Sequence, residues 1–161
     1  MSNKDLETRR KELEKDIQEA RNELYVLNEE HVKQLKAKCE ERIGEAYKLV
    51  YDDNIRSINR GKTYYLMIID TDEIKHQLVG NTLFNQYQFK VLIFSLDDIG
   101  KEYPIKTEMR HLYKIINRNS SKPKDSRIPY DSFTSKEITM KEFLEKTREA
   151  HDIWAKNITE V

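Results

Sequence analysis

The stretch KTEMRHLYKIINR, residues 106–118, contains the residue types in this sequence that could do chemistry. It has a cation at every fourth position, namely Lys106, Arg110, Lys114 and Arg118. Guanidinium and ammonium groups are the usual protein donors to phosphate oxygens. A spacing of four residues puts these cations on one face whether the segment is a strand or a helix. The pattern therefore predicts a cationic face that could bind an anion.

The charge around this face is local, because the 29 Lys and Arg residues of the chain balance its 29 Asp and Glu residues. A neutral chain would not hold a duplex nucleic acid strongly, so a short or cyclic nucleotide suits the face better. The alternative is that the cations keep an edge strand from pairing with other chains. Over residues 106–127, seven cations minus two acids give +5; the cations are Lys106, Arg110, Lys114, Arg118, Lys122, Lys124 and Arg127, and the acids are Glu108 and Asp125.

Other site chemistries find little support in the sequence. The single cysteine, Cys39, has no partner for a disulfide, and no Cys and His cluster has zinc spacing. The four His residues lie beside no recognisable nucleophile motif, and the four Gly residues form no phosphate loop. We therefore expect no enzyme activity, no metal and no cofactor. With no signal peptide and no run of about 18 apolar residues, we expect a cytoplasmic protein without a membrane partner.

An N-terminal helix is expected because residues 3–43 contain no Gly or Pro and show a heptad pattern. One core position holds Leu6, Leu13, Ala20 and Leu27, and the other holds Arg10, Ile17, Leu24 and His31. A small domain cannot bury so narrow a stripe on a helix ~60 Å long. The pattern predicts a coiled-coil helix over 1–43 that forms a homo-oligomer, ended by Gly44, and a second domain over 44–161.

The second domain is expected to be an antiparallel, Greek-key-like sheet followed by a helix, which makes the fold class α+β. Short β-branched and aromatic runs at 46–51, 62–70 and 88–96 predict strands. Residues 105–118 fit both periods: the hairpin signal at 97–100 favours a strand, whereas Pro104 favours a helix. Polar residues 117–127 predict a mobile loop. A capping box begins a helix over about 139–158, with a face made of Met140, Phe143, Leu144, Thr147, His151, Trp154 and Ile158.

Three stretches carry a family resemblance: IGEAYKLVYD at 43–52, TYYLMIID at 63–70 and EITMKEF at 137–143. The chain resembles small phage-encoded proteins with a coiled-coil helix, a compact antiparallel domain and a closing helix. Within that class its architecture resembles the first Thoeris anti-defence family, sponges that sequester cyclic ADP-ribose signals. The resemblance implies a pocket at a subunit interface, contacted by an aromatic residue, a polar side chain and arginines. The nearest matches are Phe84, Asn85, Arg110 and Arg127.

The expected function is that of a non-catalytic, phage-type counter-defence protein that binds and sequesters a nucleotide immune signal in the host cytoplasm. One alternative is an inhibitor of a host defence nuclease, similar to an anti-CRISPR, which would use the same basic face. Another is a coiled-coil structural or assembly factor. The expected ligand-binding residues are Phe84, Asn85, Lys106, Arg110, Lys114 and Arg127.

Overall fold

The structure is a computed structural model that describes residues 2–53, 58–72, 75–79, 82–86, 88–116 and 132–160. The chain divides into two compact units, Met1–Lys38 and Cys39–Val161. The expected loop at 117–127, and with it Arg118, Lys122, Lys124 and Arg127, lies outside the described residues.

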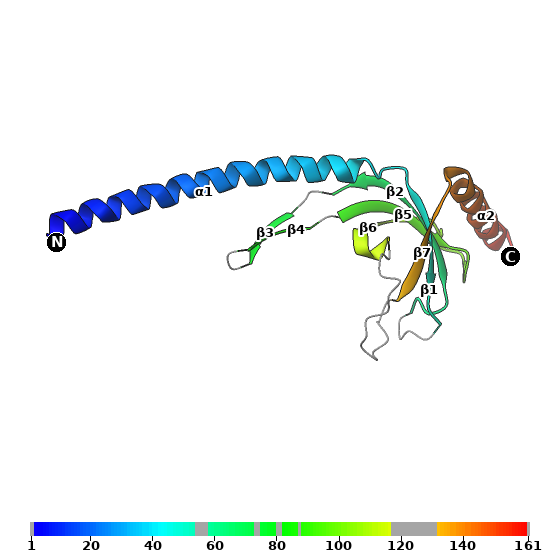
Figure 1. The fold of residues 1–161 in the computed structure, drawn as a ribbon. Coiled ribbons are helices and arrows are strands. Elements are labelled where there is room, and N and C mark those ends of the chain that lie inside the picture. Colours follow the sequence, from blue (N-terminus) through cyan, green and yellow to red (C-terminus); the bar gives the residue numbers. More distant parts are fainter. Residues whose placement is uncertain are drawn as a thin grey trace. The chain divides into compact units, whose positions relative to one another are not determined.

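Helix α1, Asn3–Glu40, is continuous over 38 residues (Figure 1). At its start the amide of Asp5 donates to the Ser2 hydroxyl (3.3 Å), and the Ser2 amide donates to the Asp5 carboxylate (3.2 Å). This reciprocal cap satisfies two backbone donors at the helix start. The helix ends at Glu40, and a further turn leads to Gly44, whose φ of +96° is left-handed. The glycine thus has the expected conformation, although it follows this added turn.

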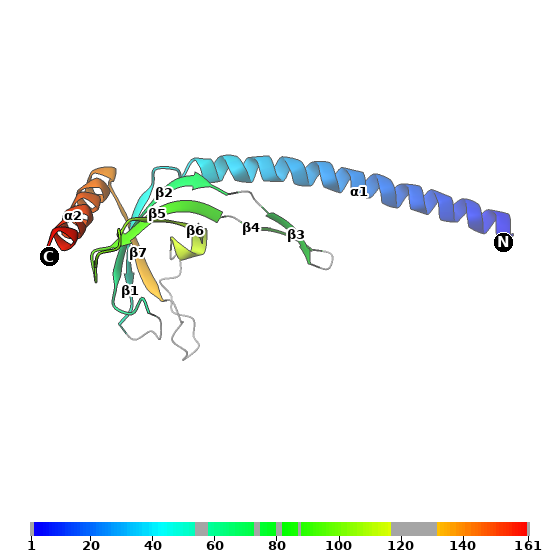
Figure 2. The same cartoon turned by 180° about the vertical axis from the view of Figure 1, so that it is seen from behind.

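The second unit is built on a five-stranded antiparallel sheet. Its strands are β1 (Ala46–Tyr51), β2 (Thr63–Thr71), β5 (Gln88–Ser95), β6 (Lys106–His111) and β7 (Phe133–Ile138), in the order β6-β5-β2-β1-β7 (Figure 2). β7 returns to pair with β1 along its whole length, a Greek-key-type connection. Strands β3 (Lys75–Val79) and β4 (Thr82–Gln86) form a separate antiparallel pair. The expected α+β class is confirmed.

The strands bury side chains on both faces of the sheet, because alternate residues point to opposite sides. One face carries a core with many ring side chains, which also contacts the 3-10 helix η1 (Leu112–Lys114) and the residues just after it. Its buried members are Cys39, Tyr47, Leu49, Tyr51, Leu66, Ile68, Phe89, Val91, Ile93, Ile115 and Phe133. The opposite face holds a second core of Ala46, Tyr65, Phe94, Phe143 and Ala150.

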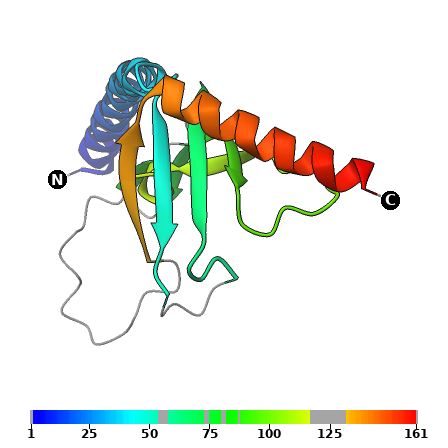
Figure 3. The same cartoon turned by 90° about the vertical axis from the view of Figure 1, so that its right-hand side faces the viewer.

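Helix α2, Met140–Thr159, covers this second face and runs across β1, β2 and β5 (Figure 3). The Glu142 amide donates to the Thr139 hydroxyl (3.1 Å), as the capping motif predicted. Phe143 is buried, and the Trp154 indole donates to the Lys101 carbonyl (3.0 Å). The predicted apolar face of α2 was wrong in part, because Met140, Leu144 and Ile158 are 41%, 56% and 45% exposed. The packed face includes Ala150 instead, because a small side chain lets the helix approach the sheet.

The segment that fitted two periods contains two kinds of structure. Its first half is the edge strand β6, paired with β5 from Ile93↔Lys106 to Gln88↔His111. Its second half turns into η1, and Ile115 just after η1 is fully buried. The change of period at Leu112 explains why the apolar residues matched both templates.

Candidate functional site

Two cations of the predicted face, Lys106 and Arg110, lie on the same side of β6, since residues four apart in a strand share a face. Glu108 lies between them on that same side. Lys106 also pairs with Glu102 through its ammonium group (3.0 Å). Carboxylates therefore accompany both cations, and the face on β6 carries much less free positive charge than the spacing alone indicated.

Arg110 is the least exposed of the described cations of this face, with a side chain only 11% exposed. Its Nε donates to a Glu108 carboxylate oxygen (2.6 Å). Its Nη1 donates to the Tyr51 hydroxyl and to the Lys114 carbonyl, both at 3.2 Å. The guanidinium thus joins β6 to β1 and to η1, and these contacts hold the end of the strand where the chain turns.

The charge of Arg110 is secured by the same partners. Burial alone would lower the pKa of the guanidinium, but the hydrogen bond and charge of Glu108, together with Tyr51, raise that pKa above its ordinary value. Tyr51 in turn packs edge-on against Tyr64 (5.5 Å between ring centroids) and against Phe133 (5.3 Å). A permanently charged guanidinium therefore lies at the rim of a cluster of aromatic rings.

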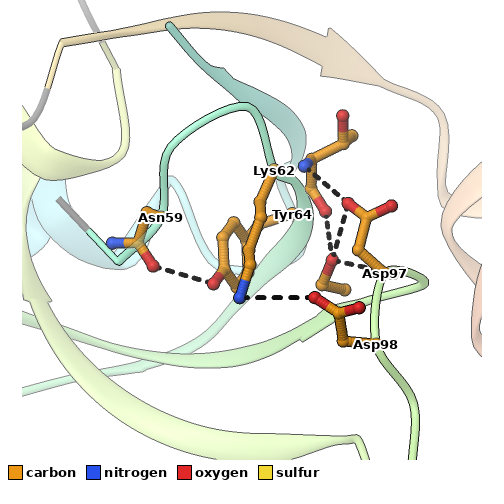
Figure 4. A network of polar contacts seen from close by, with 7 residues as sticks. Asn59, Lys62, Tyr64, Asp97 and Asp98 are labelled. Atoms are coloured by element: carbon orange, nitrogen blue, oxygen red, sulfur yellow. Dashed lines mark hydrogen bonds and ion pairs between the residues drawn. The ribbon is translucent and has the colours of Figure 1, made fainter. Parts of the chain in front are cut away.

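A second polar network fixes the loop between β5 and β6 to the start of β2 (Figure 4). The Thr63 amide donates to an Asp97 carboxylate oxygen (3.0 Å), and the Lys62 ammonium lies 3.6 Å from the Asp98 carboxylate. The Tyr64 hydroxyl donates to the Asn59 side-chain oxygen (2.8 Å), while burial raises the pKa of Tyr64. These contacts set the position of the loop that borders β6.

Two neighbouring depressions flank Arg110. The larger, of about 560 Å³, is called the loop depression because residues 97–104 are among those that line it, together with Tyr64 and Lys106. The smaller, of about 300 Å³, is called the Lys114 depression. It is lined by Tyr51, Asn59, Glu108, Met109, Arg110, Tyr113, Lys114 and Phe133. Asn59, Glu108 and Arg110 border both.

The two depressions differ in the sign of their charge. Among the described residues that line it, the loop depression has three cations (Lys101, Lys106 and Arg110) and four acids (Asp97, Asp98, Glu102 and Glu108), so three minus four gives −1. The described residues that line the Lys114 depression include two cations and one acid, so two minus one gives +1. Among the described residues, the Lys114 ammonium has no carboxylate partner, whereas Lys106 does. An anion is therefore better accommodated in the Lys114 depression.

Aromatic surface is available in the Lys114 depression as well. Tyr113 is 68% exposed and stacks in parallel on His111, with the ring centroids 5.4 Å apart. Met109, at the same rim, is also exposed. What these described residues offer is a cation, polar side chains and ring faces, which are the groups that bind a small anionic ligand with an aromatic part.

The predicted site residues are distributed over different elements. Lys106, Arg110 and Lys114 border the two depressions, whereas Phe84 and Asn85 belong to β4 of the two-stranded sheet, opposite Gln77 and His76. Arg127 lies outside the described residues. Sequence reasoning missed Tyr51, Asn59, Tyr64, Tyr113 and Phe133. Strand alternation alone would place Tyr51 on the same face as Leu49, but no local sequence signal connects Tyr51 to Arg110.

Comparisons of this chain with protein-family models, with curated proteins and with solved structures found no match. Neither described helix is long and apolar enough to span a membrane. In the part of the chain that the structure describes, no three His, Cys, Asp or Glu side chains gather where they could hold a metal ion. The fold and the two depressions are therefore the basis for a functional proposal.

Proposed function

We propose that this chain is a non-catalytic binding protein that withholds a small phosphorylated ligand of nucleotide size in the Lys114 depression. The observation that carries the proposal is the Lys114 ammonium, without a described carboxylate partner, beside the aromatic rings of Tyr51, Tyr113 and Phe133. Sequestration of a nucleotide immune signal, as in a phage counter-defence protein, is the biological form of this proposal and comes from the family resemblance.

The size and charge of the depression support a small ligand. Its volume of about 300 Å³ lies at the lower end of the range of ~300–1,000 Å³ that ligand pockets occupy. The Lys114 ammonium can accept a phosphate as a point charge, while the exposed ring of Tyr113 can stack on a base. Arg110 contributes positive potential, although its nitrogens Nε and Nη1 are already engaged within the protein.

The test is a thermal-shift screen, followed by titration calorimetry, against mononucleotides, cyclic dinucleotides and trinucleotides, and cyclic ADP-ribose isomers. A ligand at 100 times its Kd adds ~2.7 kcal/mol to the free energy of unfolding. Lys114→Glu should weaken binding at least tenfold, because it removes a charge-assisted contact and adds repulsion. Lys141→Glu, an exposed change on α2 outside the depression, is the matched control.

Lys114 is a cleaner probe than Arg110, since Arg110 makes internal contacts that a substitution would also break. If the wild-type protein binds no compound of the panel, the proposal fails and the nuclease-inhibitor alternative gains weight. Equal affinity of wild type and Lys114→Glu for a ligand of the panel would move the site away from this depression.

A second candidate function, that of a coiled-coil assembly factor, is favoured by one observation. The apolar heptad residues Leu6, Leu13, Ile17, Leu24 and Leu27 are 45–60% exposed. An apolar row of this kind on a soluble helix marks an interaction surface. Such a protein would assemble through α1 without any stabilisation by the ligand panel.

A further inference from the structure

The heptad positions of α1 define the surface that a partner helix would cover. Positions d hold Leu6, Leu13, Ala20 and Leu27, and positions a hold Arg10, Ile17, Leu24 and His31. This set is called the α1 seam. Every one of these side chains is exposed along the continuous helix (Figure 1). A β-branched residue at a, such as Ile17, combined with Leu at d favours two-stranded pairing.

The residues that flank the α1 seam carry charges of both signs. Positions g hold Arg9, Asp16 and Glu23, and positions e hold Glu7, Glu14 and Arg21. Arg9 is paired within its own helix with Glu12 (3.3 Å), and Glu14 with Arg10 (3.1 Å). Asp16 and Arg21, in contrast, make no ion pair with another described residue. These two opposite charges at the centre of the seam are available to a partner.

In a parallel pair with both helices in register, each g residue lies near the e residue five positions later on the other helix. Arg9 then meets Glu14 of the second copy, and Asp16 meets Arg21 of the second copy. Each contact occurs twice by symmetry, which gives four attractive contacts. The next such pair joins Glu23 to Asn28, so no like charges meet between these g and e positions.

Antiparallel pairing places like charges together. Two antiparallel registers keep most of the α1 seam overlapped. In one, Ile17 lies opposite Leu13, and this puts Asp16 against Asp16 and Glu14 against Glu14. In the other, Ile17 lies opposite Ala20, and Asp16 then faces Glu23. Both retain four attractive contacts but add two repulsive ones, so charge favours the parallel arrangement.

Arg10 destabilises the parallel arrangement, because parallel pairing places the Arg10 side chains of the two copies in the same layer of the interface. The Glu14 carboxylate lies 3.1 Å from its guanidinium in the same helix, and the Arg10 side chain is 80% exposed. The charge is thus compensated within its own helix, near the start of that helix. A single charged residue at an a position fixes register at some loss of stability, because any shift would set it against an apolar layer.

We propose that α1 pairs with α1 of a second copy, parallel and in register, with Asp16 of each helix bound to Arg21 of the other. The proposal rests on self-association through α1 and is independent of any ligand in the Lys114 depression. Its consequence is that both chains leave the paired helices at the same end, after Glu40.

Disulfide trapping in the full chain tests the direction and register. Leu6→Cys and Leu27→Cys, each alone in glutathione redox buffer, should form a covalent dimer, because equal positions face each other. In the antiparallel registers Leu6 faces Leu24 or His31, so neither variant would link to itself. Tyr25→Cys, outside the seam, and wild type, whose Cys39 is buried, are the controls.

Charge reversal tests the central ion pair. Arg21→Asp should raise the dissociation constant on the order of tenfold, since both contacts to Asp16 become repulsive. Asp16→Arg combined with Arg21→Asp should recover most of the affinity. Lys15→Asp, at the outer position f, carries the same charge change and should have little effect.

Sedimentation and light scattering separate the outcomes. A wild-type mass of one chain at micromolar concentration overturns self-association itself. A mass of two chains without self-linking at position 6 or 27 overturns the parallel register alone. Loss of ligand binding by Lys114→Glu bears only on the proposed function, because that residue lies outside α1.

Discussion

Arg110 shows how the surroundings of a residue decide its role. The four-residue spacing correctly indicated that Lys106 and Arg110 share a face of the strand, because that conclusion needs only the two-residue period. The spacing could not indicate that the Arg110 guanidinium would bind Tyr51, which lies 59 residues away in sequence. That contact depends on the order of the strands, so the sequence predicted the direction of the side chain but not its partner.

Tyr47 provides a pH-dependent prediction at the same scale. Burial, and then the hydrogen bond to Glu45, raise the pKa of its phenol above the ordinary value of 10.0. The folded state thus keeps this proton to a higher pH than the unfolded state. The resulting stability is present below pH 10.0 and is lost as the pH rises from there toward the folded pKa.

We expect the free energy of unfolding, measured in urea, to fall between about pH 9 and about pH 11. Tyr47→Phe should reduce the size of that fall, since it removes the titrating group. Tyr113→Phe, which removes an exposed phenol, is the control. A fall of the same size in Tyr47→Phe and wild type would contradict the assignment.

At the scale of elements, strands with a strong apolar pattern of their own were predictable. The runs at 46–51, 62–70 and 88–96 correspond to β1, β2 and β5 within a residue at each end. Strand β7 was not predicted, because Phe133 is its one buried side chain and it exists by pairing with the distant β1. A strand that forms mainly by pairing with a neighbouring strand has little apolar pattern of its own from which it could be predicted.

Helix α2 allows a prediction about which apolar residues hold it. Phe143→Ala should lower the free energy of unfolding by ~3–5 kcal/mol, because the ring is 1% exposed in the second core. Leu144→Ala, the next residue and 56% exposed, should change it by less than ~0.5 kcal/mol. Urea denaturation gives both values. Similar losses for the two variants would mean that the helix packs through a different face.

At the scale of the whole molecule, the two compact units predict separable behaviour. A 38-residue helix whose apolar seam stays in water is marginally stable by itself, since helices in proteins depend on packing. Leu13→Glu combined with Leu24→Glu should therefore reduce the mass in light scattering to one chain and weaken the helical circular dichroism signal. The thermal transition of the unit Cys39–Val161 should remain.

The matched control for that double variant is Thr8→Glu combined with Asn22→Glu, which adds the same charge at outer positions f. It should keep the wild-type mass. If both double variants retain that mass, α1 is not the surface through which the chain associates.

Trp154, whose indole donates to the Lys101 carbonyl and whose ring meets Tyr103 edge-on at 4.8 Å, is the single tryptophan of the sequence. Lys101 and Tyr103 line the loop depression and take no part in the Lys114 depression. Tryptophan emission therefore reports on the loop depression and not on the Lys114 depression. A molecule that enters the loop depression should shift the Trp154 emission, whereas one that binds beside Lys114 should leave that emission unchanged. The protein thus contains its own fluorescent probe for locating a bound ligand.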